Sequence, residues 1–170
     1  SILATIGIMV SQIYWVRNAL ELQNNDFRNK VTSSLKNVAN KIWELKRDET
    51  VVYNSVQEID PSYYIVQVNH QITPELLEHF LREQLDLNEL LIDFEYGQYD
   101  CTVDSVINMK YVSVENKKHD AGVTTLDFPK VSRENYYFAV YFPSRKVYIG
   151  SQMDLWIYSS IFLLLVLCLL

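Results

Sequence analysis

The chain has 170 residues, of which 49% are hydrophobic and 21% are charged. All its Lys, Arg, Asp and Glu side chains lie between Arg17 and Asp154, so residues 1–16 and 155–170 carry no charge. This distribution argues against an ordinary soluble globular protein, which does not collect its charge-free residues in two terminal blocks. It also argues against the core of a multi-span transporter, because the region between the two blocks is too rich in charge. The chain has 15 basic and 21 acidic residues. This balance argues against a nucleic-acid partner, because phosphate binding requires a positive surface.

The two charge-free blocks, residues 1–16 and 155–170, are predicted to be membrane-spanning helices in contact with lipid. Both are shorter than the roughly 20 apolar residues of a full span, and we expect both to be truncated. A signal peptide is the alternative for residues 1–16, but neither a basic n-region nor a small-residue cleavage site is visible there. Aromatic side chains that favour the membrane interface stand where each block meets the charged region. These predicted anchors are Tyr14, Trp15, Trp156 and Tyr158.

Residues 17–154 form one predicted domain, which is large enough to bury a core of its own. It opens with a long helix continuous with the first apolar block, because the chain has neither Gly nor Pro from Ser11 to Arg47. An apolar stripe follows the helical period at Phe27, Val31, Leu35, Val38, Ile42 and Leu45. The stripe can form a coiled-coil seam or pack on its own domain, and we expect it to pack on its own domain.

Short runs of β-branched and aromatic residues predict the strands of this domain. They fall at residues 63–68, 91–96, 111–114 and 136–142, and residues 147–150 are expected to pair back on the last of these as a hairpin. Thr73, Pro74 and Glu75 mark a helix start, with Thr as the N-cap, and residues 117–122 form a polar loop. The order of elements predicts an α+β fold, with a mostly antiparallel sheet and helices on one of its faces.

The domain has no motif that carries catalysis or binds a metal ion. The three His residues do not combine with Cys, Asp or Glu at the spacing of a zinc site. Asp100 and Asp104 lack the glycine and the distal Glu of a calcium loop. His79 is followed by Phe80 rather than by the Glu-Leu-Arg-Thr-Pro run of a kinase phosphoacceptor. We therefore predict that this chain is not an enzyme, that it holds no metal and that it needs no cofactor.

Several stretches, in order along most of the chain, carry a resemblance to a known family. They are Ser-Gln-Ile-Tyr-Trp-Val-Arg-Asn-Ala-Leu at residues 11–20, Asp-Phe-Arg-Asn-Lys-Val at 26–31, Leu-Lys-Asn-Val at 35–38, Asp-Phe-Glu-Tyr-Gly-Gln-Tyr-Asp at 93–100 and Tyr-Phe-Pro-Ser-Arg-Lys-Val-Tyr at 141–148. An apolar block that opens near Trp156 follows within a few residues. The pattern resembles the N-terminal region of two-component sensor histidine kinases of the Bacteroidetes type.

The resemblance implies a sensor domain at residues 17–154, held in the periplasm by two helices of the inner membrane. It also implies a homodimer with a PAS-like or Cache-like sheet, an unknown stimulus ligand or periplasmic partner, and a cytoplasmic response regulator. The kinase core that acts on the regulator would follow the second span and is not part of these residues. The alternative is a periplasmic interaction domain of a membrane complex, such as an exporter subunit.

Candidate residues for a ligand site are aromatic or Arg side chains of the sheet and its loops, which combine apolar area with polar reach. They are Tyr96, Tyr99, Arg133, Tyr136 and Tyr137. The alternative is that these tyrosines are ordinary cross-strand pairs of the sheet. Gly150 is the candidate joint for signal relay, because it stands close to the second apolar block and glycine tolerates unusual backbone angles.

Overall fold

The computed structural model describes residues 2–47, 54–114 and 136–169. The chain divides into two compact units, one formed by residues 29–145 and the other by residues 1–28 together with residues 146–170. The longest element is the helix α1 (Ile2–Lys46), which runs without interruption for 45 residues. This helix confirms the prediction made from the Gly- and Pro-free stretch, although residues of α1 belong to both units.

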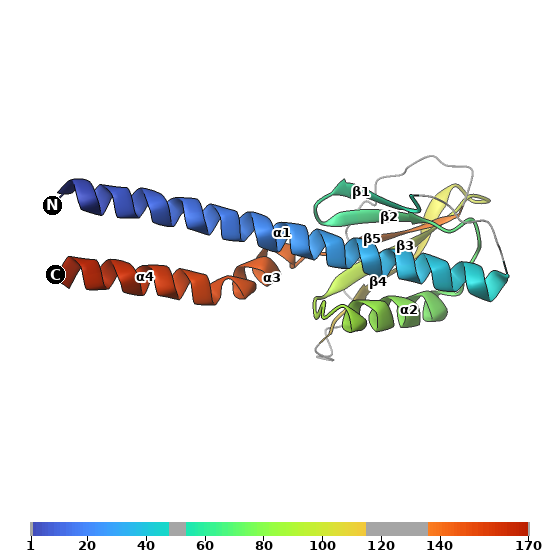
Figure 1. Ribbon diagram of the computed structural model, residues 1–170. Helices are drawn as coiled ribbons and strands as arrows, with labels where there is room; N and C mark the ends of the chain where they lie inside the picture. The colour runs from blue at the N-terminus through green and yellow to red at the C-terminus, as the bar shows by residue number, and fades with distance from the viewer. Residues whose placement is uncertain (1, 48–53, 115–135, 170) are drawn as a thin grey trace. The chain divides into compact units, whose positions relative to one another are not determined.

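The unit of residues 29–145 contains a sheet of five strands, which confirms the predicted α+β class (Figure 1). The strands are β1 (Val56–Asp60), β2 (Tyr63–Gln67), β3 (Phe94–Asp100), β4 (Ser105–Val112) and β5 (Tyr137–Tyr141). Their order across the sheet is β1-β2-β5-β3-β4, and every pair of neighbours is antiparallel. β5 therefore occupies the centre of the sheet although it is the last strand in the chain.

The last part of α1 and the helix α2 (Pro74–Leu87) lie side by side in this unit (Figure 1). Ser34 Oγ of α1 donates a hydrogen bond to the carbonyl oxygen of Gln84 in α2, at 3.1 Å. Two contacts tie the helices to the strands. Trp43 Nε1 donates to the carbonyl of Val68 at 3.0 Å, and Lys110 Nζ of β4 lies 2.6 Å from Glu78 Oε2 of α2. The two helices thus pack on one face of the sheet, as the sequence predicted.

The apolar stripe of α1 supplies much of the core in this unit. Val31, Leu35, Val38 and Ile42 are fully buried, and Leu77, Leu81 and Leu85 are buried on α2. Removing such side chains from water is the main favourable contribution to folding. The expectation that the stripe packs on its own domain is confirmed for these four positions. It is wrong for Leu45, whose side chain is 55% exposed near the end of the helix.

The ends of α2 show why this segment is helical. Pro74 stands at the first helical position, where its missing N–H removes no hydrogen bond, and Thr73 holds the N-cap position with no side-chain hydrogen bond. At the other end, Glu89 N donates to Asp86 O and Leu90 N donates to Leu85 O. With the positive φ of 58° at Glu89, these bonds form a Schellman motif, which ends a helix and satisfies its last carbonyls.

Three strand predictions need correction. The strand expected at residues 91–96 begins at Phe94 and continues through Gly97, which pairs with Ala139, to Asp100. The strand expected at residues 111–114 is the end of β4, which begins at Ser105. β1 was not predicted, because its largely exposed sequence, Val-Gln-Glu-Ile-Asp, has little apolar pattern. The predicted loop at residues 117–122 lies outside the described residues.

The hairpin predicted at residues 147–150 is wrong, because these residues belong to the helix α3 (Arg145–Gln152). The physical reason lies in the sheet. β5 is hydrogen-bonded to β2 on one side and to β3 on the other, so no edge of β5 remains for a returning strand. Pro143 lacks an N–H for a strand ladder, and Arg145 N donates to Phe142 O in the turn that leads into α3.

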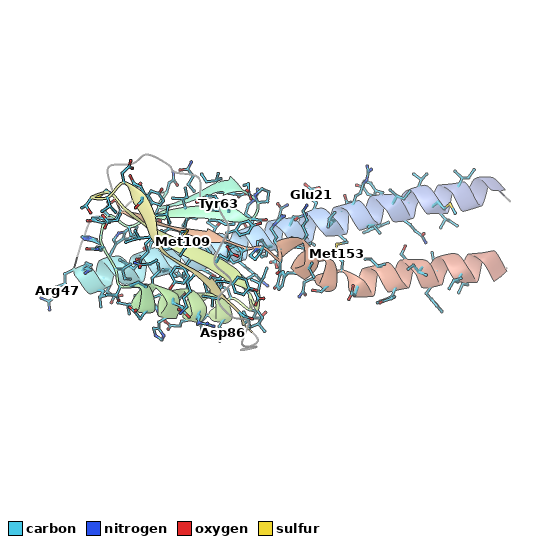
Figure 2. All side chains as sticks on the ribbon, turned by 180° about the vertical axis from the view of Figure 1, so that it is seen from behind. Glu21, Arg47, Tyr63, Asp86, Met109 and Met153 are labelled. Carbon is cyan, nitrogen blue, oxygen red and sulfur yellow. The ribbon has the colours of Figure 1, made fainter. Side chains whose placement is uncertain are left out.

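The second unit contains the first part of α1, residues of α3 and the helix α4 (Asp154–Leu169). Met153, labelled in Figure 2, lies between α3 and α4, and its N–H donates to Gly150 O at 3.0 Å. Within this unit the rings of Phe27 and Tyr148 pack with their centroids 5.8 Å apart. In the described parts of the chain, no helix combines the length and the apolar character that crossing a membrane requires.

Candidate functional site

The face of the sheet opposite α1 and α2 is rich in tyrosine, and several of its side chains are buried. Side chains alternate between the two faces of a strand, and one face carries a buried cluster of Tyr63, Ile65, Tyr99, Tyr137 and Ala139, with Cys101, Val106 and Tyr141 packed against it. We call this face, together with Glu95 and Tyr111, the tyrosine face. It draws on β2, β5, β3 and β4, so residues far apart in the sequence meet on it.

The strand register arranges the tyrosine face in rows. One row runs Tyr63, Tyr141, Glu95 and Tyr111 across β2, β5, β3 and β4. The next row contains the small pair Ala139 and Gly97, and a further row contains Tyr137 and Tyr99. Side chains directly opposite each other on antiparallel strands lie about 5 Å apart at Cβ. Between the two tyrosine-bearing rows lie Ala139 and Gly97 at the centre of the sheet, with Ile65 beside them on β2.

Glu95 is the one carboxylate in the middle of the first row, between Tyr141 on one side and Tyr111 on the other. Its Oε2 atom is buried and has no hydrogen-bond partner among the described residues. Burial raises the pKa of the Glu95 carboxyl above its usual value, since the charged form loses water. A buried acceptor without a donor is uncommon in a native protein and calls for a physical explanation.

The carboxylate of Asp93, two residues before Glu95 along the chain, has hydrogen-bond donors, whereas Glu95 Oε2 has none among the described residues. The Asp93 carboxylate accepts hydrogen bonds from Tyr111 Oη at 2.6 Å, from Ser113 Oγ at 3.2 Å and from Val114 N at 2.9 Å. Burial and the bond to Asp93 together raise the pKa of Tyr111 to about 12. These bonds fix the Tyr111 ring beside Glu95 and direct its hydroxyl away to Asp93.

The other tyrosine row holds a stacked pair. The rings of Tyr99 and Tyr137 are nearly parallel, at 9°, with their centroids 4.5 Å apart. Tyr99 Oη donates a hydrogen bond of 2.6 Å to Asp104 Oδ1, and this bond, followed by desolvation, raises the pKa of Tyr99 to about 12. The Tyr99 hydroxyl therefore stays protonated at neutral pH, and both rings of the pair are buried.

The structure brings together some of the predicted ligand-site residues and separates others. Tyr99, Tyr136 and Tyr137 line one small cavity of about 10 Å³, which has room for about one water molecule. Tyr96 lies on the opposite, helix-covered face, where its hydroxyl donates to Pro74 O at 3.2 Å, so it does not join them. Arg133 lies outside the described residues. The predicted set thus includes a stacked cross-strand pair, as the alternative expected.

Two larger hollows flank α2. One, of about 550 Å³, lies beside the helix N-terminus and is lined by Lys46, Thr73, Gln98 and their neighbours. The other, of about 370 Å³, is a groove with an apolar floor and a rim that contains His79, Arg82 and Glu83. Its charged lining residues are of both signs, with Arg82 beside Glu83 and Asp86. Among the described residues, no three His, Cys, Asp or Glu side chains are placed to hold a metal ion.

The remaining predicted residues lie in the second unit. Tyr14, Trp15 and Tyr158 are largely exposed on α1 and α4, and the side chain of Trp156 lies outside the described residues. Gly150 lies inside α3 rather than at the end of a strand. A Cβ built on Gly150 would meet nothing within 4 Å, so no close approach requires a glycine there. Its role in signal relay stays a prediction.

Comparison of the chain with protein-family models, with curated proteins and with solved structures finds no match in any of the three. The interpretation of function therefore depends on the residues themselves. Sequence reasoning did not select Tyr63, Glu95, Tyr111 or Tyr141. The signal that could have found Glu95 is the alternation of acidic and apolar residues at 91–96, which places Asp93 and Glu95 on the same face of a strand.

Proposed function

We propose that this chain is the extracytoplasmic sensing region of a membrane-bound sensor histidine kinase. In this proposal residues 1–16 and 155–170 anchor the chain in the inner membrane, and the domain between them lies in the periplasm. Two copies form a homodimer, and a kinase core elsewhere in the full-length protein acts on a cytoplasmic response regulator. The sheet, with a long helix on one face and tyrosines on the other, would be of the PAS-like or Cache-like type.

The observation that carries this proposal is the distribution of exposed apolar side chains. On the first part of α1 and on α4, large apolar side chains are exposed at successive turns: Ile6, Met9, Val10, Ile13, Ile161, Phe162, Leu163 and Leu165. Contiguous exposed apolar surface marks contact with a membrane or another protein. Residues 29–145, in contrast, bury a core of their own. A folded domain between two apolar helices is the arrangement that a membrane-anchored receptor needs.

The proposed mechanism is a shift of population between two states. A ligand that binds one arrangement of the domain better than another favours that arrangement by the difference in binding free energy. The two terminal helices would carry this change to the kinase core. Because α3 and α4 are separated by Met153 alone, the exit to the second apolar block has little slack to absorb a shift.

The test is a labelling experiment on the full-length protein in intact cells. Asp86, exposed on α2, is replaced by Cys in a background in which Cys101 and Cys168 are Ser. A membrane-impermeant maleimide should label this cysteine without cell lysis, and the protein should stay in the membrane after carbonate extraction. Purified full-length protein should phosphorylate itself on histidine with ATP. Labelling only after lysis would refute the periplasmic placement, and a membrane protein without kinase activity would favour the exporter-type alternative.

A further inference from the structure

The groove that His79, Arg82 and Glu83 border along α2, which we call the α2 groove, has the size and lining of a small-molecule site. Its volume of about 370 Å³ falls within the roughly 300–1,000 Å³ that such sites occupy. Leu91 and Val114 line it and are 62% and 36% exposed, so the groove opens to solvent at these side chains. Its floor is apolar and buried, and consists of Leu85, Leu90, Ile92 and Phe94.

The wall of the α2 groove on the helix side carries charges of both signs in a fixed order. Arg82 and Asp86 both line the groove. Residues four apart lie on the same side of a helix, and a rise of about 1.5 Å per residue separates these two by about 6 Å along the axis. One face of α2 therefore presents a base and, about one turn closer to the C-terminus, an acid.

The end of the wall at Arg82 is positive. Arg82 Nε donates a hydrogen bond of 3.0 Å to Glu78 Oε1, and Nη1 donates one of 3.3 Å to the carbonyl of Ser113, so the guanidinium is turned away from Asp86. Glu78 also pairs with Lys110 at 2.6 Å. One carboxylate is thus shared between two cations, and the group keeps a net positive charge. The Arg82 side chain is 44% exposed, and these bonds use two of the five N–H donors of a guanidinium.

The end of the wall at Asp86 is negative. Asp86, labelled in Figure 2, is exposed in the last turn of α2, and that turn contains no basic side chain. The helix macrodipole places a partial negative charge at the same end. Glu83, between the two ends, is paired with Lys41 at 2.7 Å. The charge beside the apolar floor thus changes from positive at Arg82 to negative at Asp86.

We propose that the α2 groove binds a small linear zwitterion whose amino and carboxylate groups are separated by a methylene chain, as in an ω-amino acid. The carboxylate lies at Arg82, the methylene chain covers the apolar floor, and the ammonium group lies at Asp86. The inference rests on the proposed function only in treating this ligand as the stimulus. Binding itself depends on α2 and the sheet, and requires neither a membrane nor a kinase core.

The test is isothermal titration calorimetry on the purified 170-residue chain in mild detergent. The probe is 6-aminohexanoate, and a titration into micelles alone gives the blank. Two control ligands each lack one charge, since hexanoate has no ammonium group and n-hexylammonium has no carboxylate. We expect saturable binding of 6-aminohexanoate and binding about fivefold weaker for each control, the effect of losing one favourable ionic contact at an exposed site.

Matched variants assign the two ends of the groove. Asp86→Asn should weaken the binding of 6-aminohexanoate about fivefold and leave that of hexanoate unchanged. Arg82→Gln should weaken the binding of 6-aminohexanoate and leave that of n-hexylammonium unchanged. Glu44→Gln removes an equal charge from the exposed surface of α1, outside the groove, and should bind 6-aminohexanoate normally.

Circular dichroism shows whether each variant is folded, and the comparison of Asp86→Asn with Glu44→Gln decides if Arg82→Gln is not. Absence of saturable binding by the unaltered chain would overturn the proposal. Equal binding of hexanoate and 6-aminohexanoate, or equal effects of Asp86→Asn and Glu44→Gln, would overturn it as well. Failure of the labelling and phosphorylation experiments would refute the proposed function and leave this binding result standing.

Discussion

Replacement of Trp43 by Phe tests how α1 is held against the sheet. Trp43 is 6% exposed, and its Nε1 donates a hydrogen bond of 3.0 Å to the carbonyl of Val68, which is itself buried. Phe keeps an aromatic ring at this position but cannot donate. The substitution therefore removes one buried donor and leaves the Val68 carbonyl without it.

The expected loss in the free energy of unfolding follows from two effects. A buried carbonyl that loses its donor costs about 1–3 kcal/mol. The smaller ring leaves unfilled volume, which adds about 1 kcal/mol when the surroundings do not relax. The total of about 2–4 kcal/mol is a large share of the free energy of unfolding of an ordinary domain, which is about 5–15 kcal/mol.

The assay is urea unfolding of the whole chain in mild detergent, followed by far-ultraviolet circular dichroism. Trp15→Phe is the matched control, because Trp15 lies on the same helix but is 63% exposed. We expect this control to change the free energy of unfolding by less than about 0.5 kcal/mol. Equal, small effects of the two substitutions would refute the reasoning, since the Trp43 hydrogen bond would then contribute nothing to stability.

Three further substitutions give separate outcomes. Gly150→Ala should stabilise the chain by about 0.5–1 kcal/mol in thermal unfolding, because Ala favours the helix α3 and its Cβ meets no atom within 4 Å; destabilisation would contradict the helical assignment. Leu81→Ala, at a fully buried position, should cost about 2–5 kcal/mol in urea unfolding, whereas Leu87→Ala, at a position 68% exposed, should cost little; similar losses would argue against the packing of α2. At Glu78, burial favours a raised pKa, but hydrogen bonds from two basic side chains outweigh it and lower the pKa below 4.5. The stabilisation is present above that value and is lost as pH falls through the lowered pKa, so Glu78→Gln should flatten acid unfolding curves in this window, and an unchanged curve would rule out the linkage.

The helices α1 and α2 could be predicted from the sequence because their signals are local. The period of the α1 stripe and the Thr73-Pro74 start of α2 each lie within one element. The strands at residues 63–68 and 136–142 were also found, since they are dense in aromatic and β-branched residues. These signals were sufficient for the α+β class.

The predictions from the sequence were wrong where the structure of a segment depends on residues far away in the chain. Residues 147–150 are rich in β-forming side chains, yet they are helical because β2 and β3 already occupy both edges of β5. The candidate site likewise depends on residues that are far apart in the chain. Tyr99 and Tyr137 were both selected as aromatics, but only the register shows that they stack. Glu95 and Tyr141 come together solely through the pairing of β3 with β5.

The central position of β5 has a consequence for how the chain is synthesised and folds. β1 pairs with β2, and β3 pairs with β4, so two local hairpins can form as soon as each pair has left the ribosome. β2 and β3 are not neighbours in the sheet, and among the described strands it is β5 (Tyr137–Tyr141) that pairs with both hairpins. An isolated two-stranded hairpin is at best marginally stable in water. A nascent chain released before residue 137 would therefore hold two unjoined hairpins with open edges, which makes it prone to aggregation. Cooperative folding of the sheet must wait for its last strand, and contacts of such long sequence separation make that step slow.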